Sequence, residues 1–383
     1  AGRCAAARGR RAEAGGMSAA PMRVVVLGLS LSSAWGNGHA TTYRALLKEF
    51  AARGHDILFL ERDVPWYSGG NRDLADADYC RLSFYTSLED LEDWKGEIAS
   101  ADAMIVGSYV PDGIEVGRWV QETAKGVTAF YDIDTPVTLA ALERGECDYL
   151  SAELIPGYDL YLSFTGGPTL DRLEQQYGSP AARALYCSVD TGAYMPLDVP
   201  KKWDLSYLGT YGPDRQPTLE RLLIEPARRM PAKRFVVAGP QYPAEIDWPA
   251  NVERIDHLPP AGHPAFYAAS RYTLNVTRAD MIAAGWSPSV RLFEAAACGV
   301  PIISDRWDGL DQLFAPGREI EIADTTEDVI RRLEEPEAAA DAMGQAARAM
   351  ILRAHGAGHR AAELEAYLEE AGSSVRVLEG SAM

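Results

Sequence analysis

The sequence has little cysteine, no long apolar run and a deficit of basic residues. Its 383 residues include five cysteines, an odd number with no CxxC pair, which indicates neither a disulfide framework nor a zinc site. No apolar stretch approaches the roughly 20 residues of a membrane span. Lys and Arg number 37 against 55 Asp and Glu, and the resulting net charge of −18 argues against nucleic-acid binding. We therefore expect a cytoplasmic protein with reduced thiols, no membrane span and no nucleic-acid partner.

The overall composition is that of a folded globular protein. Hydrophobic residues make up 47% of the chain and charged residues 24%. At about 150 residues per domain, the length predicts two or three domains. Residues 1–21 are Ala/Gly/Arg-rich without the apolar centre of a secretory signal, and we expect a disordered extension there. Residues 372–383 are expected to form a loose tail.

Short apolar runs alternate with amphipathic helical stretches through most of the chain. Residues 22–60 hold one such unit: a strand over 22–28, a Ser/Gly loop, a helix over 40–53 and a strand over 56–60. This alternation predicts α/β architecture with doubly wound parallel sheets. Further strands are expected at 103–107, 127–131, 158–164, 184–189, 205–209, 234–239, 252–255, 272–276 and 301–304.

The alternation breaks at residues 191–202, which contain two prolines and no periodicity. We interpret this segment as a linker. It separates a Rossmann-like domain over 22–190 from a second one over 203–355. Two such domains face each other across a cleft at the C-terminal ends of their strands, where ligands of this fold class bind.

The most informative segment is residues 287–304, SPSVRLFEAAACGVPIIS. Ser287 suits a helix N-cap and Pro288 the first helical position. Glu294 then lies in the middle of the helix among apolar residues, with Arg291 one turn before it. Two interpretations stand. The pair is an ordinary helical ion pair, or the carboxylate binds a ribose diol while the arginine and the helix N-terminus face a diphosphate.

This segment resembles the donor site of two-domain (GT-B) glycosyltransferases of the group 1 type. The longer stretch 275–305 resembles their CgeB-like (spore maturation protein) branch. The same resemblance is carried by FYDIDTPVTL at 130–139, YDLYLSFTGGPTL at 158–170, LYCSVD at 185–190 and LPPAGHPAFY at 258–267. It spans about residues 22–370.

The resemblance implies a hexosyltransferase-like enzyme (EC 2.4) with an acceptor-binding first domain and a donor-binding second domain. A helix over 356–371 is then expected to cross back to the first domain. The donor is a nucleoside-diphosphate sugar, by default a UDP-sugar, and the acceptor is a small molecule, a glycan or a protein. No metal and no cofactor are expected. If group 1 stereochemistry holds, transfer retains the anomeric configuration.

By the same resemblance, Glu294 holds the ribose, and arginines hold the diphosphate with a glycine turn close by. For each arginine the alternative is a solvated surface charge. The candidate donor-binding residues are Gly38, Gly209, Thr210, Arg215, Arg278, Trp286, Ser287, Arg291 and Glu294.

The chain departs from the group 1 pattern at Trp286, eight residues before Glu294. Group 1 enzymes commonly have a sugar-contacting glutamate at this position. The indole either stacks on the transferred sugar or fills a loop as an ordinary hydrophobic residue. The departure leaves the identity of the donor sugar open.

Two side chains of the first domain are candidate catalytic residues. The loop before His39 contains glycine but is neither a P-loop nor GxGxxG, and we expect it to present backbone N–H groups to the cleft. His39 is a candidate general base, with phosphate binding, capping or a structural role as alternatives. Asp134 either caps the helix that follows or binds the acceptor. Asp132 is assigned a structural role, and the formal DxD motif of residues 132–134 is not taken as a metal site.

Two rival functions remain open. A nucleotide-sugar epimerase on the same fold would turn over the donor without any acceptor. A non-catalytic nucleotide- or carbohydrate-binding protein would bind without turnover, and the absence of the first glutamate favours this rival. The scaffold alone does not decide between them.

Overall fold

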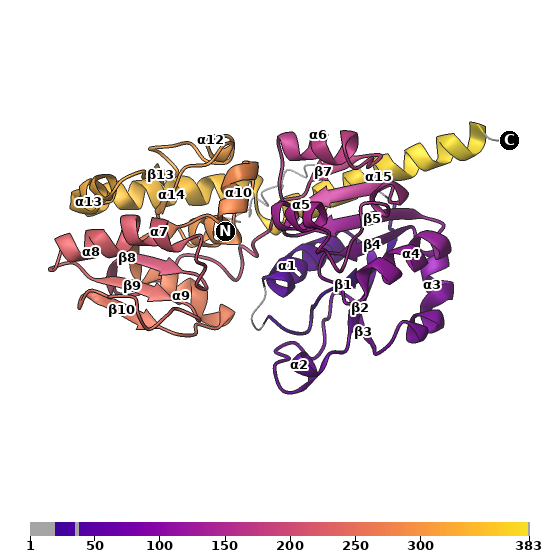
Figure 1. Cartoon of the computed structure of the whole chain (residues 1–383), viewed down its shortest axis with the longest axis horizontal. Helices are drawn as coiled ribbons and strands as arrows, with labels where there is room; N and C mark the ends of the chain where they lie inside the picture. The colour runs from indigo at the N-terminus through magenta and orange to yellow at the C-terminus, as the bar shows by residue number, and fades with distance from the viewer. Residues whose placement is uncertain (1–19, 35–37, 382–383) are drawn as a thin grey trace, which may run out of the picture.

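The computed structural model describes residues 20–34 and 38–381 (Figure 1). The first half of the chain forms alternating strands and helices: β1 (Arg23–Gly28), α1 (His39–Ala52), β2 (Asp56–Arg62), α2 (Pro65–Ser68), β3 (Arg81–Tyr85), η1 (Glu89–Trp94), α3 (Lys95–Ser100), β4 (Ala103–Gly107), α4 (Gly113–Thr123), β5 (Val127–Asp132), α5 (Thr135–Arg144), η2 (Ile155–Gly157), β6 (Leu160–Ser163), α6 (Pro168–Gln175) and β7 (Ala182–Ala184).

The second half repeats the pattern and ends in three helices. Its elements are β8 (Trp203–Leu208), α7 (Gln216–Leu219), η3 (Glu220–Ile224), α8 (Glu225–Arg229), β9 (Phe235–Ala238), β10 (Val252–Ile255), η4 (Pro260–Gly262), α9 (His263–Ala268), β11 (Ser270–Asn275), α10 (Ala279–Ala284), α11 (Val290–Ala297), β12 (Ile302–Ser304), α12 (Leu310–Leu313), β13 (Glu321–Ile322), α13 (Thr326–Glu334), α14 (Glu337–Ala354) and α15 (Ala357–Ser381).

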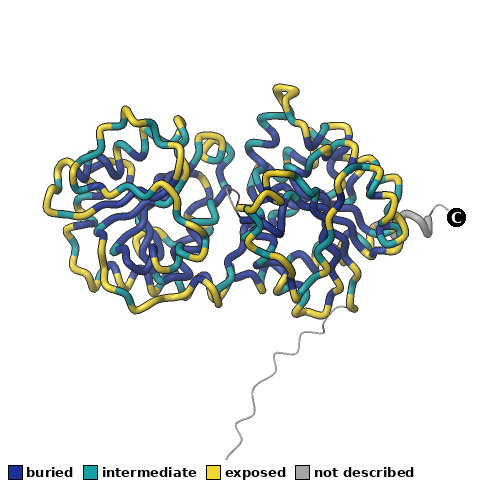
Figure 2. The backbone as a smooth tube through the Cα atoms, turned by 90° about the horizontal axis from the view of Figure 1, so that it is seen from below, coloured by how far each residue is buried: buried dark blue, intermediate teal, exposed yellow. Residues whose placement is uncertain are grey.

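Each half contains one parallel sheet. The strand order is β3-β2-β1-β4-β5-β6-β7 in the first sheet and β10-β9-β8-β11-β12-β13 in the second. Every paired strand runs parallel to its neighbour. The central strands are buried along nearly their whole length, as their continuous apolar runs require of a sheet covered on both faces (Figure 2). The predicted α/β fold class with two doubly wound sheets is confirmed.

The strand order reverses direction at β1/β4 in the first sheet and at β8/β11 in the second. Loops that leave neighbouring strands at such a switch point diverge to opposite faces and open a crevice at the C-terminal edge of the sheet. The segments that follow β1 and β8 are therefore brought by the topology to this edge of their sheets.

The chain passes between the two domains twice. Residues 191–202 contain no helix or strand and lead from the first domain to β8. The second passage lies between α14, which packs on α11, and α15, which packs on α1 and β5 (Figure 1). The two passages touch, because the N–H of Ala357 donates to the carbonyl of Val189 at 3.1 Å. The last helix therefore does cross back to the first domain.

Several details differ from the sequence prediction. The edge strands β3 and β13 and the short helix α10 have too little apolar periodicity to be recognised in the sequence. The strand expected at 184–189 is β7, which ends at Ala184. The tail expected to be loose from residue 372 is helical to Ser381, since no proline interrupts the chain after Ala357. Of the extension expected at 1–21, residues 1–19 lie outside the described part of the chain.

Among the described helices, none combines the length and the apolar character that crossing a membrane requires.

A buried carboxylate fastens α15 to the first domain. Glu365 forms an ion pair with Arg53 and lies 3.0 Å from Nε2 of His55, with only 7% of its side chain exposed. The N–H of Met22 donates to Nδ1 of the same imidazole at 3.1 Å, so the proton on Nε2 faces the carboxylate.

We expect Glu365→Ala to lower the free energy of unfolding by about 2 kcal/mol, because it leaves His55 buried without its partner. Urea unfolding measures the change. Glu370→Ala is the matched control on the same helix. It removes an ion pair with Arg183 in which 59% of the Glu370 side chain is exposed. This variant should lower the free energy of unfolding by less than about 0.5 kcal/mol. Equal losses in the two variants would contradict the assigned role of Glu365.

Candidate active site in the interdomain cleft

A cleft of about 340 Å³ lies where the C-terminal edges of the two sheets face each other. The first domain contributes residues on either side of the start of α1, including Ala34, Gly38 and Thr41. The second domain contributes the turns after β8 and β9, the loop before α9 and the first turns of α11. The cleft is thus built from both domains, at the edges that the switch points predict.

Glu294 lies on α11 with its carboxylate in the wall of this cleft. It is 5% exposed, and its Oε2 accepts a hydrogen bond from the Tyr267 hydroxyl at 3.2 Å. Nδ1 of His263 lies 3.8 Å from the same oxygen. Both partners come from α9, on the C-terminal side of the cleft. A carboxylate oriented in this way by one oxygen can accept hydrogen bonds from a diol with the other.

Arg291 lies one turn before Glu294, yet within the described structure the two form no ion pair. Its Nε donates to the Leu208 carbonyl at 2.5 Å and its Nη1 to Oδ1 of Asn275 at 2.9 Å. The guanidinium therefore lies across the end of β8 and lines the cleft. Of the two interpretations of this pair, the helical ion pair is wrong, because tertiary partners separate the two side chains.

Glycine at position 209 lets the arginine approach the chain. A Cβ at Gly209 would lie 2.9 Å from Nη2 of Arg291. Gly239, at the end of β9, has φ +141, and a Cβ there would lie 2.1 Å from the Gly209 carbonyl oxygen. Both glycines line the cleft, and the packing around each leaves no room for a side chain.

Arg215 and Thr210 complete this side of the cleft. Nη2 of Arg215 donates to the Thr210 carbonyl at 2.5 Å, and both residues line the cleft. Among the described residues, none accepts a hydrogen bond from the buried Nε of Arg215. A buried guanidinium N–H without an acceptor is costly, and an anionic ligand in the cleft would supply one.

Arg278, Trp286 and Ser287 lie outside the lining of this cleft. Arg278 is the N-cap residue of α10, with its Nε 3.9 Å from Oδ2 of Asp214. Trp286 packs against the backbone of loops from both domains. The predicted N-cap role of Ser287 is wrong, because the helix begins at Val290 after Ser289, while the Ser287 hydroxyl accepts from Oγ1 of Thr165 at 2.9 Å.

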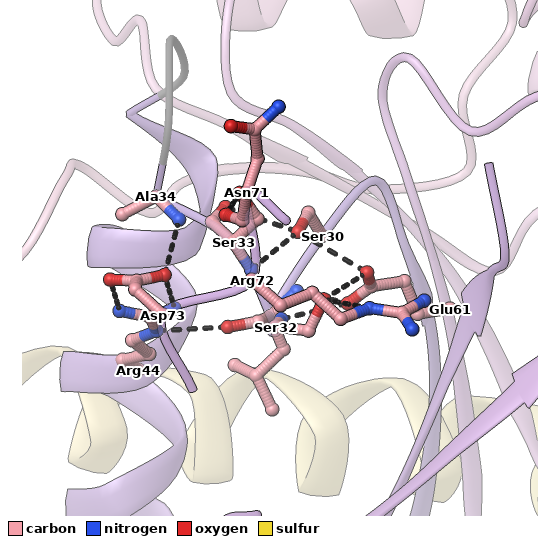
Figure 3. Close-up of polar contacts among 10 residues, drawn as sticks. Ser30, Ser32, Ser33, Ala34, Arg44, Glu61, Asn71, Arg72 and Asp73 are labelled. Carbon is pink, nitrogen blue, oxygen red and sulfur yellow. Dashed lines mark hydrogen bonds and ion pairs between the residues drawn. The ribbon is translucent and has the colours of Figure 1, made fainter. Parts of the chain in front are cut away.

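Part of the loop after β1 binds carboxylates of the first domain through its backbone N–H groups (Figure 3). The N–H groups of Leu31 and Ser32 both donate to Oε2 of Glu61, at 2.7 and 2.8 Å. The N–H of Ala34 donates to Oδ1 of Asp73 at 2.9 Å. Carboxylates from neighbouring segments thus occupy donors that a phosphate would need. The remaining residues of this loop, 35–37, lie outside the described residues.

His39 is the first residue of α1 and is packed edge-on against Tyr109, with ring centroids 5.3 Å apart. Burial lowers the pKa of His39 from 6.5 to about 4. Its Nδ1 is buried, and no described residue forms a hydrogen bond with it. The imidazole is therefore neutral at pH 7, with one ring nitrogen left for a ligand, but it is a weak base.

Asp134 occupies the N-cap position of α5, but its side chain makes no capping hydrogen bond. Its Oδ2 accepts from the Tyr109 hydroxyl at 3.3 Å. Burial raises the pKa of Asp134, while the charges of Arg278 and Arg215 oppose that rise. Asp134 therefore belongs to the same electrostatic environment as two of the candidate arginines, and Tyr109 links it to His39.

Asp132 has a structural environment. It is fully buried, and accepts from the Tyr161 hydroxyl at 2.6 Å, the Thr138 hydroxyl at 2.8 Å and the Asp134 N–H at 3.1 Å. Within the described part of the chain, no three His, Cys, Asp or Glu side chains form a cluster that could hold a metal ion.

Sequence reasoning did not assign the contacts that Asn275, Tyr267, His263 and Tyr109 make with candidate side chains, nor those that Glu61 makes with the loop after β1. Asn275, Tyr267 and His263 lie within the stretches that carry the family resemblance, but their roles depend on contacts between elements. Glu61 had a weak signal in the sequence, a charged residue at the end of an apolar strand. Its partners are about 30 residues away along the chain.

Comparisons with known proteins agree with this architecture. Residues 215–366 match the family described as "Glycosyl transferase-like". Among solved structures, the chain is similar to sucrose-phosphate synthase from Thermosynechococcus elongatus, with a TM-score of 0.67 at 14% identity, covering 92% of this chain and 100% of that one. The fold is that of the GT-B glycosyltransferases. No curated protein matches the sequence.

Two further GT-B structures were determined with nucleotides bound. An α-glucosyltransferase in complex with UDP and a 13-mer DNA has a TM-score of 0.68 at 12% identity, covering 92% of this chain and 100% of that one. Anabaena HepE in complex with UDP and glucose has a TM-score of 0.65 at 12% identity, covering 91% of this chain and 100% of that one. At sequence identities this low, the similarity to these structures establishes the fold alone.

The low pKa of His39 predicts that its ring does not titrate between pH 5 and pH 8. Following the histidine Cε1 proton resonances by NMR over this range tests the statement, with His39→Gln to assign the signal. A His39 signal that titrates near 6.5 would show that the ring is solvated and would restore it as a candidate base.

Asp132 gives the stability a defined pH dependence. Its pKa is about 6 in the folded protein because of burial, above the unfolded value of 3.8, so the folded state favours the protonated form. The contribution of Asp132 to the free energy of unfolding is therefore complete below pH 4. It falls by about 3 kcal/mol as the pH rises through 6. In urea unfolding, we expect the stability of Asp132→Asn relative to wild type to rise by about this much between pH 4 and pH 7. A pH-independent difference would contradict the assignment.

Proposed function

We propose that the protein is a glycosyltransferase that moves a sugar from a nucleoside-diphosphate sugar, first of all a UDP-sugar, to an acceptor hydroxyl. The observation that carries this proposal is the arrangement of Glu294 and two arginines around one cleft that Gly209 and Gly239 also line. A carboxylate and two guanidinium groups in one cleft offer the acceptor that a ribose diol needs and the cations that a diphosphate needs.

In this proposal, the free oxygen of Glu294 accepts from the ribose hydroxyls. Arg291 and Arg215 bind the diphosphate, with Gly209 and Thr210 allowing close approach of the backbone. The departing diphosphate gains negative charge, and fixed cations beside it stabilise the transition state without needing a divalent ion. The N-terminus of α11, next to Arg291, adds a favourable dipole.

On the acceptor side, His39 positions rather than deprotonates the hydroxyl, since its pKa is about 4. Burial raises the pKa of Asp134, which keeps this carboxylate a candidate proton acceptor. Retaining transfer follows from the group 1 resemblance and needs no strong protein base. The acceptor must enter between the two domains, and docking of the domains around it excludes water that would hydrolyse the donor.

Other observations support parts of this proposal. The matched family covers the segment from Arg215 to the start of α15, which includes Arg291 and Glu294. Two GT-B structures with similar folds contain UDP, which favours a uridine nucleotide as the first to test. The net charge of −18 argues against a polyanionic acceptor such as DNA. The CgeB-like branch and the hexosyltransferase subclass stay predictions from the sequence.

Isothermal titration calorimetry with UDP, GDP, dTDP, CDP and ADP, each with EDTA present, tests the donor site. We expect one diphosphate, UDP first, to bind without metal. Glu294→Gln should weaken its affinity about 10- to 100-fold, because the hydrogen bonds that the charged group makes to the ribose become weaker. Glu253→Gln is the matched control, since Glu253 lies on β10 outside the cleft lining and accepts from Trp203.

Failure of all five diphosphates to bind a folded sample would overturn the proposal. Binding followed by conversion of the sugar nucleotide without any acceptor would identify the epimerase rival. Tight binding with no turnover of any sugar nucleotide, over a screen of acceptors, would identify the binding-protein rival.

A further inference from the structure

The segment 285–288, directly before α11, is a contact between the two domains. The carbonyl of Trp286 accepts from the N–H of Gly166 at 2.9 Å. The hydroxyl of Ser287 accepts from Thr165 at 2.9 Å. Gly166 and Thr165 belong to the first domain, in the turn between β6 and α6. The donor helix is therefore tied to the first domain by the residues that lead into it.

The indole of Trp286 packs against one glycine from each domain. A Cβ at Gly167 of the first domain would lie 2.4 Å from indole Cδ2. A Cβ at Gly309 of the second domain would lie 2.4 Å from indole Cδ1. The indole N–H donates to Oε1 of Gln312 at 2.8 Å. We call this set, Gly167, Trp286, Gly309 and Gln312, the tryptophan clamp. Any side chain at either glycine would collide with the ring.

The backbone of Trp286 is also unusual, with φ +42. A bulky residue adopts this region only where its surroundings hold it there, and such strain gathers at functional sites. Here the N–H of Trp286 is held by the carbonyl of Asp308 at 2.6 Å, while its carbonyl is held by the first domain. The strained residue therefore connects the two domains through its main chain as well as its ring.

The clamp is only a few residues from the candidate donor-binding side chains. α11 begins at Val290, four residues after Trp286, and carries Arg291 and Glu294. Ser289, between them, donates to Oδ1 of Asn275, the same oxygen that binds Arg291. A movement of the first domain is thus transmitted through a short, hydrogen-bonded segment to the start of the donor helix.

We propose that Trp286 is a positioning residue that keeps the two domains docked and thereby orients α11 for the donor. This inference rests on the proposed function, and it assigns to Trp286 a place between the domains instead of a stack on the transferred sugar. Since the cleft is lined by residues of both domains, undocking lowers the fraction of molecules that can bind a nucleotide fully. The apparent affinity falls in proportion to that fraction.

Gly309→Ala tests the clamp with a well-matched control. Gly309 (φ +88, ψ −3) and Gly145 (φ +68, ψ +29) are both left-handed, so alanine is strained at each. At Gly145, no atom lies within 4 Å of the added Cβ. At Gly309, the added methyl group would overlap with the indole of Trp286. We expect Gly309→Ala to weaken UDP binding at least about tenfold by calorimetry and to increase the radius of gyration in X-ray scattering. Gly145→Ala should change neither.

Trp286→Ala should reproduce both effects, with a circular dichroism spectrum like that of wild type. In the double variant Trp286→Ala/Gly309→Ala, the methyl group no longer meets a ring, so Gly309→Ala should add little to Trp286→Ala. Two results together would overturn the proposal. In both single variants, the UDP affinity would stay within twofold of wild type and the radius of gyration would stay within error of it. If wild type itself fails to bind UDP, the proposed donor is wrong, and the scattering measurements alone then decide whether Trp286 holds the domains together.

Discussion

Parallel strand pairing within each sheet is the constraint from which the site follows. A parallel strand needs a crossover helix, so every loop that leaves the C-terminal end of a strand emerges at the same edge of its sheet. Two sheets of this kind, placed with those edges facing, bring distant segments of a long chain to one cleft. Glu294, Arg291 and Arg215 meet there although up to 79 residues separate them in sequence, and none of them needs an unusual local conformation to do so.

The electrostatics of the cleft is set by which charges are already paired. Glu61 and Asp73 accept hydrogen bonds from the N–H groups of Leu31, Ser32 and Ala34 in the loop after β1, so these three donors are already paired (Figure 3). On the second domain, Arg215 has a buried N–H with no acceptor among the described residues. The domain that presents Arg215 and Arg291 to the cleft is therefore the one whose sequence carries the donor-site resemblance, while His39 and Asp134 of the first domain lie outside the cleft lining.

Neutralisation of side chains by burial also separates the roles of the acceptor-side residues. His39 and Asp132 are both removed from water, and each shifts toward its uncharged form. Asp132 is enclosed by hydroxyl donors and serves the fold of the strand end. Asp134, two residues later, keeps a hydrogen bond to Tyr109 and faces the charges of Arg278 and Arg215. A DxD spacing on its own did not indicate this division, because the two carboxylates point into different environments.

The sequence by itself determined the α/β class, the central strands of both sheets and the segment that forms α11. These follow from local patterns: continuous apolar runs fix buried parallel strands, and the 275–305 stretch carries motif residues at fixed spacing. Only the tertiary structure decided that Arg291 leaves Glu294 for Asn275 and Leu208, that Ser287 and Trp286 face the first domain, and that the loop after β1 turns its N–H groups toward Glu61. Each of these depends on partners between 16 and 122 residues away, and no local pattern can specify which of several possible partners a polar side chain will meet once the sheets have packed.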